Sequence, residues 1–218
     1  MLEDGLSYPV RGEWIGRVII GGVLSFLSFL LLPLIPLNGY FVEVLEETIE
    51  GRDDPPEFSD WETLFVRGIG AFLIVLAYSI VPLILWGFLA TTFFGLGAAV
   101  GGDAGGLFAG VGALSMLLFI PVLLFIYYLI PAALSNYARE GTIGAGFAFE
   151  TITGVVFTTD YLLAVLLPIV VAIILWMATF VLAITVIGLV LLPFLQFYGQ
   201  VAVFRMFGTA FRRVSAAG

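Results

Sequence analysis

The densest group of side chains that could do chemistry is a run of five carboxylates. Hard cations bind carboxylate oxygens, but the spacing of this run matches no EF-hand loop and Pro55-Pro56 stiffens it. Paired carboxylates act as acid and base only where a pocket shifts a pKa, and nothing in the sequence marks such a pocket here. We therefore interpret the run as a solvated acidic surface. Its members are Asp53, Asp54, Glu57, Asp60 and Glu62.

Three residue types that carry much of enzyme chemistry are absent. The 218 residues include no cysteine and no histidine, and all eight basic residues are arginine. A chain without these types has no thiolate nucleophile, no imidazole base or ligand, and no lysine for a Schiff base. We therefore expect a protein that is not an enzyme and that has no cofactor and no metal site.

Two polar groups remain as candidate contacts. Gln196 and Gln200 lie four residues apart in an apolar run, so they share one face of a helix. Such amides more often join helices than bind a substrate, and we expect them to hold the last helix against the bundle. Arg139, together with Glu140, Glu150 and Asp160, is expected to form an ion pair that fixes a segment at the membrane surface; a functional gate or ligand contact is the alternative.

The elements that position these residues are membrane helices. Hydrophobic residues make up 61% of the chain, charged residues only 11%, and the mean hydropathy is +1.16. Soluble domains are about 45–50% apolar and about 25% charged, so a soluble fold of this size could not cover this apolar surface. The composition predicts one all-α integral membrane domain over residues 1–218.

About five spans, within a range of four to six, follow from the charge-free stretches. A span needs about 20 apolar residues, which places helices near 16–37, 67–94, 107–135, 161–186 and 188–207. The stretch from Tyr161 to Phe204 is too long for one crossing, and Gly188 and Pro193 are predicted to break it. The last of the five could instead be a re-entrant half-helix. Asp103 to Gly106 reads as a flexible hairpin connector.

The first of two predicted interfacial segments joins the first two spans. Its glutamates fall on one helical face, with Gly51 as the C-cap, followed by an extended Pro55-Pro56 piece. Ser59 or Asp60 is expected to cap a second short helix with Phe58, Trp61, Leu64 and Phe65 on its apolar side. Trp61 is the predicted interfacial anchor.

The second interfacial segment follows the third span, and the chain is expected to end on a surface helix. Phe147, Ile152, Val155 and Val156 are predicted to face lipid, because Glu150 keeps their segment from spanning. A C-terminal stripe of aromatic residues beside arginines predicts an amphipathic helix that lies on the membrane. Its members are Phe204, Arg205, Phe207, Phe211, Arg212, Arg213 and Val214.

An internal repeat with an offset of 90 residues is indicated by matched pairs. Glu50-Gly51 matches Glu140-Gly141, and Ile84-Leu85-Trp86 matches Ile174-Leu175-Trp176. The predicted units are about 18–94 and 107–186, followed by a C-terminal helix at 188–214; the alternative is convergent bilayer composition. Two parallel units would be related by a pseudo-twofold axis along the membrane normal. With five spans, six arginines share one side, which the positive-inside rule makes cytoplasmic.

The charge balance points to a salt-rich cytoplasm. Sixteen acids against eight arginines give a net charge of −8. Carboxylates hold hydrated cations and high salt screens their repulsion, so an acidic chain without lysine is typical of a haloarchaeal protein. No basic patch exists for a phosphate backbone, which argues against nucleic-acid binding.

Several short motifs, in order, resemble a known family. They are NGY (38–40), EG (50–51), PPEFSDW (55–61), LFVRG (64–68), NYAREG (136–141), FAF (147–149), TTDY (158–161) and FYGQ (197–200). Over about residues 5–208 the chain resembles the archaeal domain-of-unknown-function 4013 family of polytopic membrane proteins from haloarchaea and methanogens. The resemblance implies a membrane topology and a source, and it carries no activity, substrate or site residue.

The sequence therefore favours a non-catalytic scaffold or partner-binding subunit of the cytoplasmic membrane. The alternative is a small permease or a lipid-handling protein. The expected partners are membrane lipids, other membrane proteins or further copies of the chain. A polar cavity between the repeats would favour the permease, and a dry, fully packed bundle would favour the scaffold.

Overall fold

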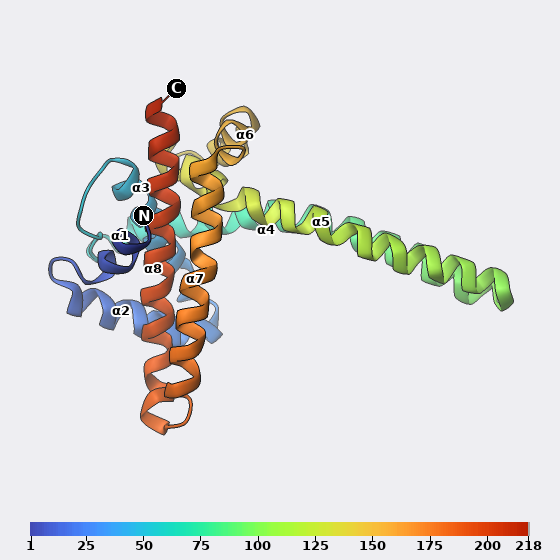
Figure 1. Cartoon of the computed structure of the whole chain (residues 1–218), viewed down its shortest axis with the longest axis horizontal. Helices are drawn as coiled ribbons and strands as arrows, with labels where there is room; N and C mark the ends of the chain where they lie inside the picture. The colour runs from blue at the N-terminus through green and yellow to red at the C-terminus, as the bar shows by residue number, and fades with distance from the viewer. Residues whose placement is uncertain (218) are drawn as a thin grey trace. The chain divides into compact units, whose positions relative to one another are not determined.

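The structure is a computed structural model that describes residues 1–217, and these residues form helices and no strand. This confirms the predicted all-α fold of a polytopic membrane protein (Figure 1). The helices, in order, are α1 (Leu2–Ser7), η1 (Tyr8–Val10), α2 (Trp14–Phe26), η2 (Leu27–Leu30), α3 (Leu34–Ile49), α4 (Trp61–Val100), α5 (Gly102–Glu140), η3 (Ile143–Phe147), α6 (Phe149–Val156), α7 (Thr159–Leu182) and α8 (Val186–Ala217).

The chain divides into two compact units, which we describe separately. Unit 1 contains Met1–Ile74 and Pro131–Gly218, and unit 2 contains Val75–Ile130. These boundaries fall inside α4 and α5 and do not coincide with the predicted repeat units.

Four helices are long and apolar enough to cross a membrane. They are α4, α5, α7 and α8, and they correspond to the predicted spans from the second to the fifth, although α7 ends at Leu182, four residues before the predicted end of the fourth span. The long apolar run does form two helices, but the break lies at Ala183–Thr185 rather than at Gly188 or Pro193, both of which lie within α8. Gly188 still shapes this turn, because a Cβ there would overlap the Leu182 carbonyl oxygen.

The first predicted span, 16–37, is wrong as a straight helix. The chain changes direction at Leu31, which has a φ of 63°, and Pro33 then begins a new helical direction. A fifth span exists only if the bent pair Leu2–Val10 and Trp14–Leu30, which meets at 93°, is counted as one. Pro33, Pro36 and the positive φ of Leu31 break the helix that the apolar composition of this segment predicts.

Helices α2 and α3 instead form a hairpin that packs against α8 (Figure 1). Gly21 and Gly22 give α2 its close contact with the rings of Phe197 and Phe194. On the return, Thr48 near the end of α3 packs on Gly208. The end of α3 therefore lies beside the charged part of α8, and the apolar tip of the hairpin is exposed at Phe29–Leu32.

The ends of the segment between α3 and α4 follow their sequence signals. Gly51 has a φ of 86°, its N–H bonds to the Thr48 carbonyl oxygen, and the Arg52 N–H bonds to that of Glu47 at 2.8 Å. This pattern is a Schellman motif and confirms Gly51 as the terminator of α3. Asp60 rather than Ser59 caps α4 by accepting the Thr63 N–H. The predicted separate short helix after it is instead the first part of α4.

Two glycines allow α3 and the first part of α4 to cross at backbone contact. A Cβ on Gly39 would overlap the Leu64 carbonyl oxygen, and a Cβ on Gly68 would overlap that of Ile35. The motifs NGY and LFVRG therefore meet at this crossing.

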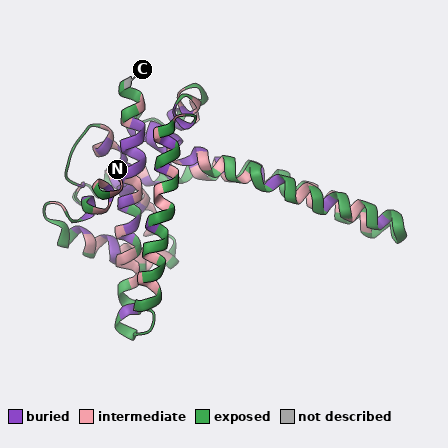
Figure 2. Cartoon of the chain, in the orientation of Figure 1, coloured by how far each residue is buried: buried purple, intermediate pink, exposed green. Residues whose placement is uncertain are grey.

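Unit 1 has an aromatic core between α3, α4 and α8. The rings of Tyr40 and Phe58 stack at 4.1 Å, and the Phe197 ring lies 5.5 Å from that of Tyr40. Helix α8 passes through the centre of this unit and is buried along much of its upper half (Figure 2). Helices α7 and α8 form an antiparallel pair (Figure 1).

Two predicted surface elements are wrong because they are packed inside unit 1. Ile152, Val155 and Val156 of α6 are buried against protein, and Phe149 and Phe157 take the exposed positions instead. The C-terminal stripe does not lie on the surface either. It continues α8, with Arg205 only 3% and Phe211 0% exposed, because the facing helices supply both apolar contacts and acidic partners.

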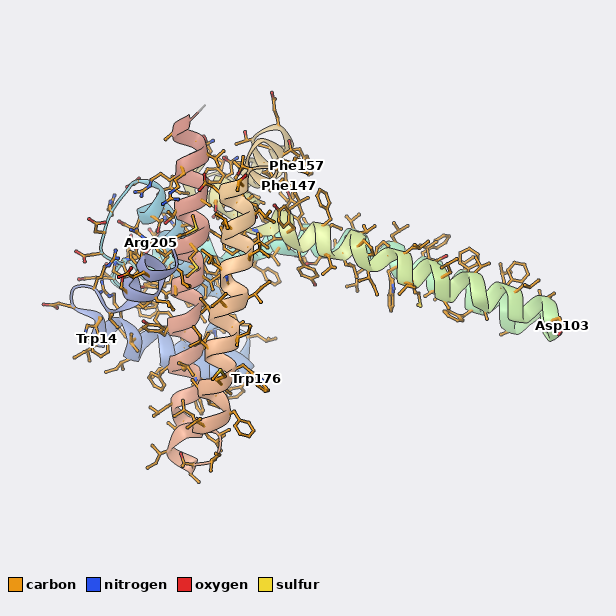
Figure 3. All side chains as sticks on the ribbon, in the orientation of Figure 1. Trp14, Asp103, Phe147, Phe157, Trp176 and Arg205 are labelled. Atoms are coloured by element: carbon orange, nitrogen blue, oxygen red, sulfur yellow. The ribbon has the colours of Figure 1, made fainter. Side chains whose placement is uncertain are left out.

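Unit 2 is a two-helix hairpin made of the second part of α4 and the first part of α5. Gly101 and Gly102, both with positive φ, form its turn, so the predicted connector from Asp103 to Gly106 already belongs to α5. Gly97 and Gly105 let the two helices touch near this turn. Most other side chains of unit 2 are exposed and apolar (Figure 2), and Asp103 lies at the tip (Figure 3).

Candidate functional site

The loop between α3 and α4 is fixed by its backbone. The carbonyl oxygens of four consecutive residues, 52–55, each accept a hydrogen bond from a different distant side chain. The donors are Arg205 to residue 52 at 2.7 Å, Arg11 to 53 at 3.1 Å, Tyr8 to 54 at 3.2 Å and Arg17 to 55 at 2.6 Å. We call this segment, Arg52 to Asp60, the acidic loop. Side chains from three other parts of the chain therefore hold its main chain against the protein.

Arg205 is the centre of this arrangement. Its Nε bonds to Asp4 at 3.0 Å, and its guanidinium lies 4.4 Å from the centre of the Tyr8 ring. Burial acts to raise the pKa of Asp4, but the hydrogen bonds and charges of Arg205 and Arg11 outweigh it and lower that pKa. The cluster therefore joins the N-terminus, the acidic loop and α8.

Arg17 is a second buried arginine at the loop. It is 6% exposed, and it also donates to the Arg11 carbonyl oxygen. Within the described residues its Nε has no partner. Sequence reasoning missed both buried arginines as anchors. The signal available was a single arginine inside an apolar run, at 17 and again at 205.

The side chains of the acidic loop point away from this anchored backbone. The Asp53 side chain is 88% exposed, and Asp54 and Glu57 are also exposed. Trp61, the predicted interfacial anchor, is 42% exposed with its ring 6.0 Å from that of Phe58. Asp60 is different, because its hydrogen bonds from Thr63 lower its pKa and commit it to capping α4. The result is an ordered acidic surface with one exposed aromatic ring.

A polar cavity of about 300 Å³ lies beside this surface. It is lined by Asp60, Glu62, Thr63, Arg67 and Tyr137, among others. Arg67 forms a two-point ion pair with Glu46 of α3. Glu43 lies one turn before Glu46 on α3. Burial raises the pKa of Glu43 to about 7, and the charge of Arg67 reduces this shift.

The ion pair that we predicted to fix the second interfacial segment forms only in part, because its members have other partners. Arg139 bonds to its neighbour Glu140 and to Ser215, and it does not reach Glu150 or Asp160 in the described residues. Asp160 instead pairs with Arg213 of α8 at 3.2 Å. The short η3 segment is held by buried Asn136, whose Nδ2 donates to the Ala145 carbonyl oxygen. Glu150 sits in the first turn of α6 with no ion pair among the described residues.

Gln196 and Gln200 share a face of α8, but that face does not pack against the bundle. Both side chains are exposed, and neither makes a hydrogen bond within residues 1–217. They line a groove of about 640 Å³ between α2, α3 and α8. The expectation that they join α8 to the bundle is therefore wrong. Gly199 beside them does pack, because a Cβ there would overlap the Leu175 side chain of α7.

No group of three acids in the described part of the chain converges as a metal site would require. No curated protein and no solved structure matches the chain. A family model, described as "Protein of unknown function (DUF4013)", matches residues 22–184. This range contains α3 to α7 and the last five residues of α2, and it leaves α8 outside. Since it covers most of the chain, the resemblance in the motifs is confirmed: the chain belongs to the domain-of-unknown-function 4013 family.

Proposed function

We propose that this protein is a non-catalytic, partner-binding subunit of the cytoplasmic membrane and that its acidic loop is the binding surface. The supporting observation is the set of four consecutive carbonyl oxygens that distant side chains hold. A solvated surface needs no such order, whereas a recognition surface gains affinity when its conformation is fixed before binding. The chemistry of the loop predicts a protein partner with basic side chains, and exposed Trp61 supplies an aromatic contact at its edge.

The path of the chain supports a cytoplasmic position for this loop. If α2 and α3 form a re-entrant hairpin, four crossings by α4, α5, α7 and α8 remain. Every arginine then lies on one side of the membrane, and Asp103 is the charged residue on the other. By the positive-inside rule that side is cytoplasmic. The arginines are Arg11, Arg17, Arg52, Arg67, Arg139, Arg205, Arg212 and Arg213.

Labelling tests this orientation in a chain that has no cysteine of its own. We expect single cysteines at Ser59 and Thr142 to react with an impermeant maleimide only after cells are opened. A cysteine at Gly102 should react in intact cells. Labelling of Ser59→Cys in intact cells would reverse the orientation.

Co-purification from native membranes in mild detergent tests the partner. The triple variant Asp54→Asn/Glu57→Gln/Glu62→Gln removes three charges that form no ion pair in the described residues. It should lose a stoichiometric basic partner that the wild type retains. The control, Glu3→Gln/Asp103→Asn/Glu150→Gln, removes the same charge elsewhere and should retain it. Equal retention by both variants would contradict the proposal.

A second candidate function is that of a small permease or a lipid-handling protein. The observation that favours it is the groove with Gln196 and Gln200, although this groove lies between α2, α3 and α8 and not between the predicted repeats. Substrate flux into vesicles that contain the purified protein would distinguish a permease from a scaffold.

A further inference from the structure

The polar composition of the groove between α2, α3 and α8 is unusual for this chain. The only two glutamines of the sequence and one of its two asparagines line it. Two serines, one from α2 and one from η2, add hydroxyl groups, and no charged side chain lines it. The polar residues are Ser25, Ser28, Asn38, Gln196 and Gln200.

Much of the hydrogen-bonding capacity of these groups is unused within the described residues. The Ser25 Oγ is buried and has no partner, and the two glutamine amides make no hydrogen bond. Ser28 and Asn38 donate to carbonyl oxygens of their own turns, at 2.9 and 2.7 Å, which leaves their acceptor atoms available. The groove therefore offers both donors and acceptors to an occupant.

At the depth of the groove, bulk water cannot supply the missing hydrogen bonds. At about 1.5 Å per residue, Gln200 lies about 7.5 Å and Gln196 about 13.5 Å along α8 from Arg205. Gln196 is also about 15 Å from Val186 at the other end of the helix. Both amides thus fall inside the charge-free part of α8, where hydrocarbon surrounds the protein and unpaired amides are costly.

An apolar cavity adjoins the polar groove. It has a volume of about 350 Å³ at the tip of the hairpin, is lined by leucines and by Phe72, and shares Leu34 and Asn38 with the groove. A polar recess next to an apolar one matches a molecule with a hydrogen-bonding headgroup and a hydrocarbon tail. The recess is within the usual size range of ligand sites.

We propose that this groove binds the uncharged, hydroxyl-bearing headgroup of a membrane lipid, with Gln196 and Gln200 as its principal contacts. An ionised headgroup would enter hydrocarbon depth with no opposite charge to compensate it, because Arg205 and Asp4 are paired with each other. The concave form of the groove suits a ligand better than a second copy of the chain, whose matching surface would be equally hollow. This inference does not depend on the acidic loop or its partner.

Native mass spectrometry of the full chain in mild detergent tests the proposal with two lipid probes. A monogalactosyl diacylglycerol supplies an uncharged hydroxyl headgroup, and phosphatidylglycerol with the same tails supplies an anionic one. The wild type should retain one galactolipid per chain. Gln196→Leu/Gln200→Leu should lower the bound fraction at least tenfold and leave retention of phosphatidylglycerol unchanged.

The control variant, Thr91→Val/Ser115→Ala, removes two polar groups from unit 2 that bond to their own helix, and it should bind like the wild type. Equal galactolipid binding by the glutamine variant would overturn the proposal. So would preferential binding of phosphatidylglycerol, or a dimer that depends on the glutamines. If the double variant does not fold, Leu192→Trp fills the groove without removing a polar group, and it should exclude the galactolipid.

Discussion

The two compact units cover their apolar side chains in different ways. Unit 1 contains all eight arginines and every acid except Asp103, and these charges join α1, the acidic loop and α8 around an aromatic core. Unit 2 buries few side chains of its own and presents leucine, phenylalanine and isoleucine outward along both helices. Around the charge cluster of unit 1 the protein supplies most of the contacts, whereas unit 2, like the exposed helix α7 of unit 1, relies on the surrounding lipid.

This difference predicts that unit 1 is sensitive to single side-chain changes and unit 2 is tolerant. Close contact, buried ion pairs and fixed loops are concentrated in unit 1, where a change has neighbours to disturb. A change on the exposed faces of unit 2 meets lipid, which rearranges freely. The predictions below test this contrast.

The largest expected effect is at the crossing of α3 and α4. Gly68→Val places a side chain where the Ile35 carbonyl oxygen lies, and backbone cannot move aside as a side chain can. We expect a loss of about 3 kcal/mol or more, so that little folded protein remains. Fluorescence-detected size-exclusion chromatography of a tagged chain measures this.

The control is Gly87→Val, in the same helix but in unit 2. Nothing lies within 4 Å of the added Cβ at that position. It should elute like the wild type. A comparable loss at Gly87 would show that unit 2 also depends on close packing and would remove the contrast.

The next effect concerns the buried arginine of α8. Arg205→Met keeps most of the side-chain volume but removes one of the two arginine donors to Asp4 and leaves the Arg52 carbonyl oxygen without its side-chain donor. Removing one partner of a buried pair costs about 3–5 kcal/mol, and the 35% exposed Asp4 side chain should bring the cost to the lower end. Thermal unfolding in detergent measures it.

Arg139→Met is the matched comparison, because the side chains of Arg139 and its partner Glu140 are 33% and 50% exposed, against 3% for Arg205. An exposed pair contributes about 0–1 kcal/mol. If the two variants unfold at the same temperature, the charge cluster does not stabilise unit 1.

How far the sequence predicts this molecule depends on which interactions decide each element. The length of the apolar runs alone determines where α4, α5, α7 and α8 form. Local sequence signals determine the end of α3 at Gly51 and the start of α4 at Asp60, so these features could be predicted. The hairpin of α2 and α3 could not, because its turn at Leu31 depends on how both helices pack against α8. Hydropathy carries no information about that contact.

The candidate sites show the same limit. That Gln196 and Gln200 share a face follows from their spacing, but which way the face turns is decided by Gly199, Phe197 and the helices that pack on them. Ser25 and Asn38 join them only in space. The four donors to the acidic loop come from residues 8, 11, 17 and 205, and no local pattern connects them.

Salt should affect unit 1 through its charge excess. Nine acids lie between Glu43 and Glu62, against a single arginine, Arg52, in the same stretch. The Debye length falls from about 10 Å at 0.1 M to about 3 Å at 1 M salt, so potassium chloride should relieve the repulsion. We expect a clear rise in the thermal midpoint between about 0.2 M and 2 M. An unchanged midpoint would contradict the halophilic interpretation of the composition.

The smallest predicted effect is at Glu43, and it tests whether a half-buried carboxyl in unit 1 opposes folding. Burial raises its pKa to about 7 in the folded chain, above the ordinary value of 4.5. Between these two values the folded state binds more protons than the unfolded state, so this group makes stability fall as pH rises from about 4.5 to 7. Above pH 7 the full destabilising effect of the buried carboxylate is present.

Glu43→Gln removes this effect and should raise stability by about 1 kcal/mol at pH 8 and little at pH 5. The gain is small because water screens a partly exposed carboxylate. Glu57→Gln, at an exposed position of the acidic loop, is the control and should show no such pH dependence. If Glu43→Gln lowers stability at pH 8, the carboxylate is held by Arg67 as a favourable partner, and the charges of unit 1 are better matched than burial alone implies.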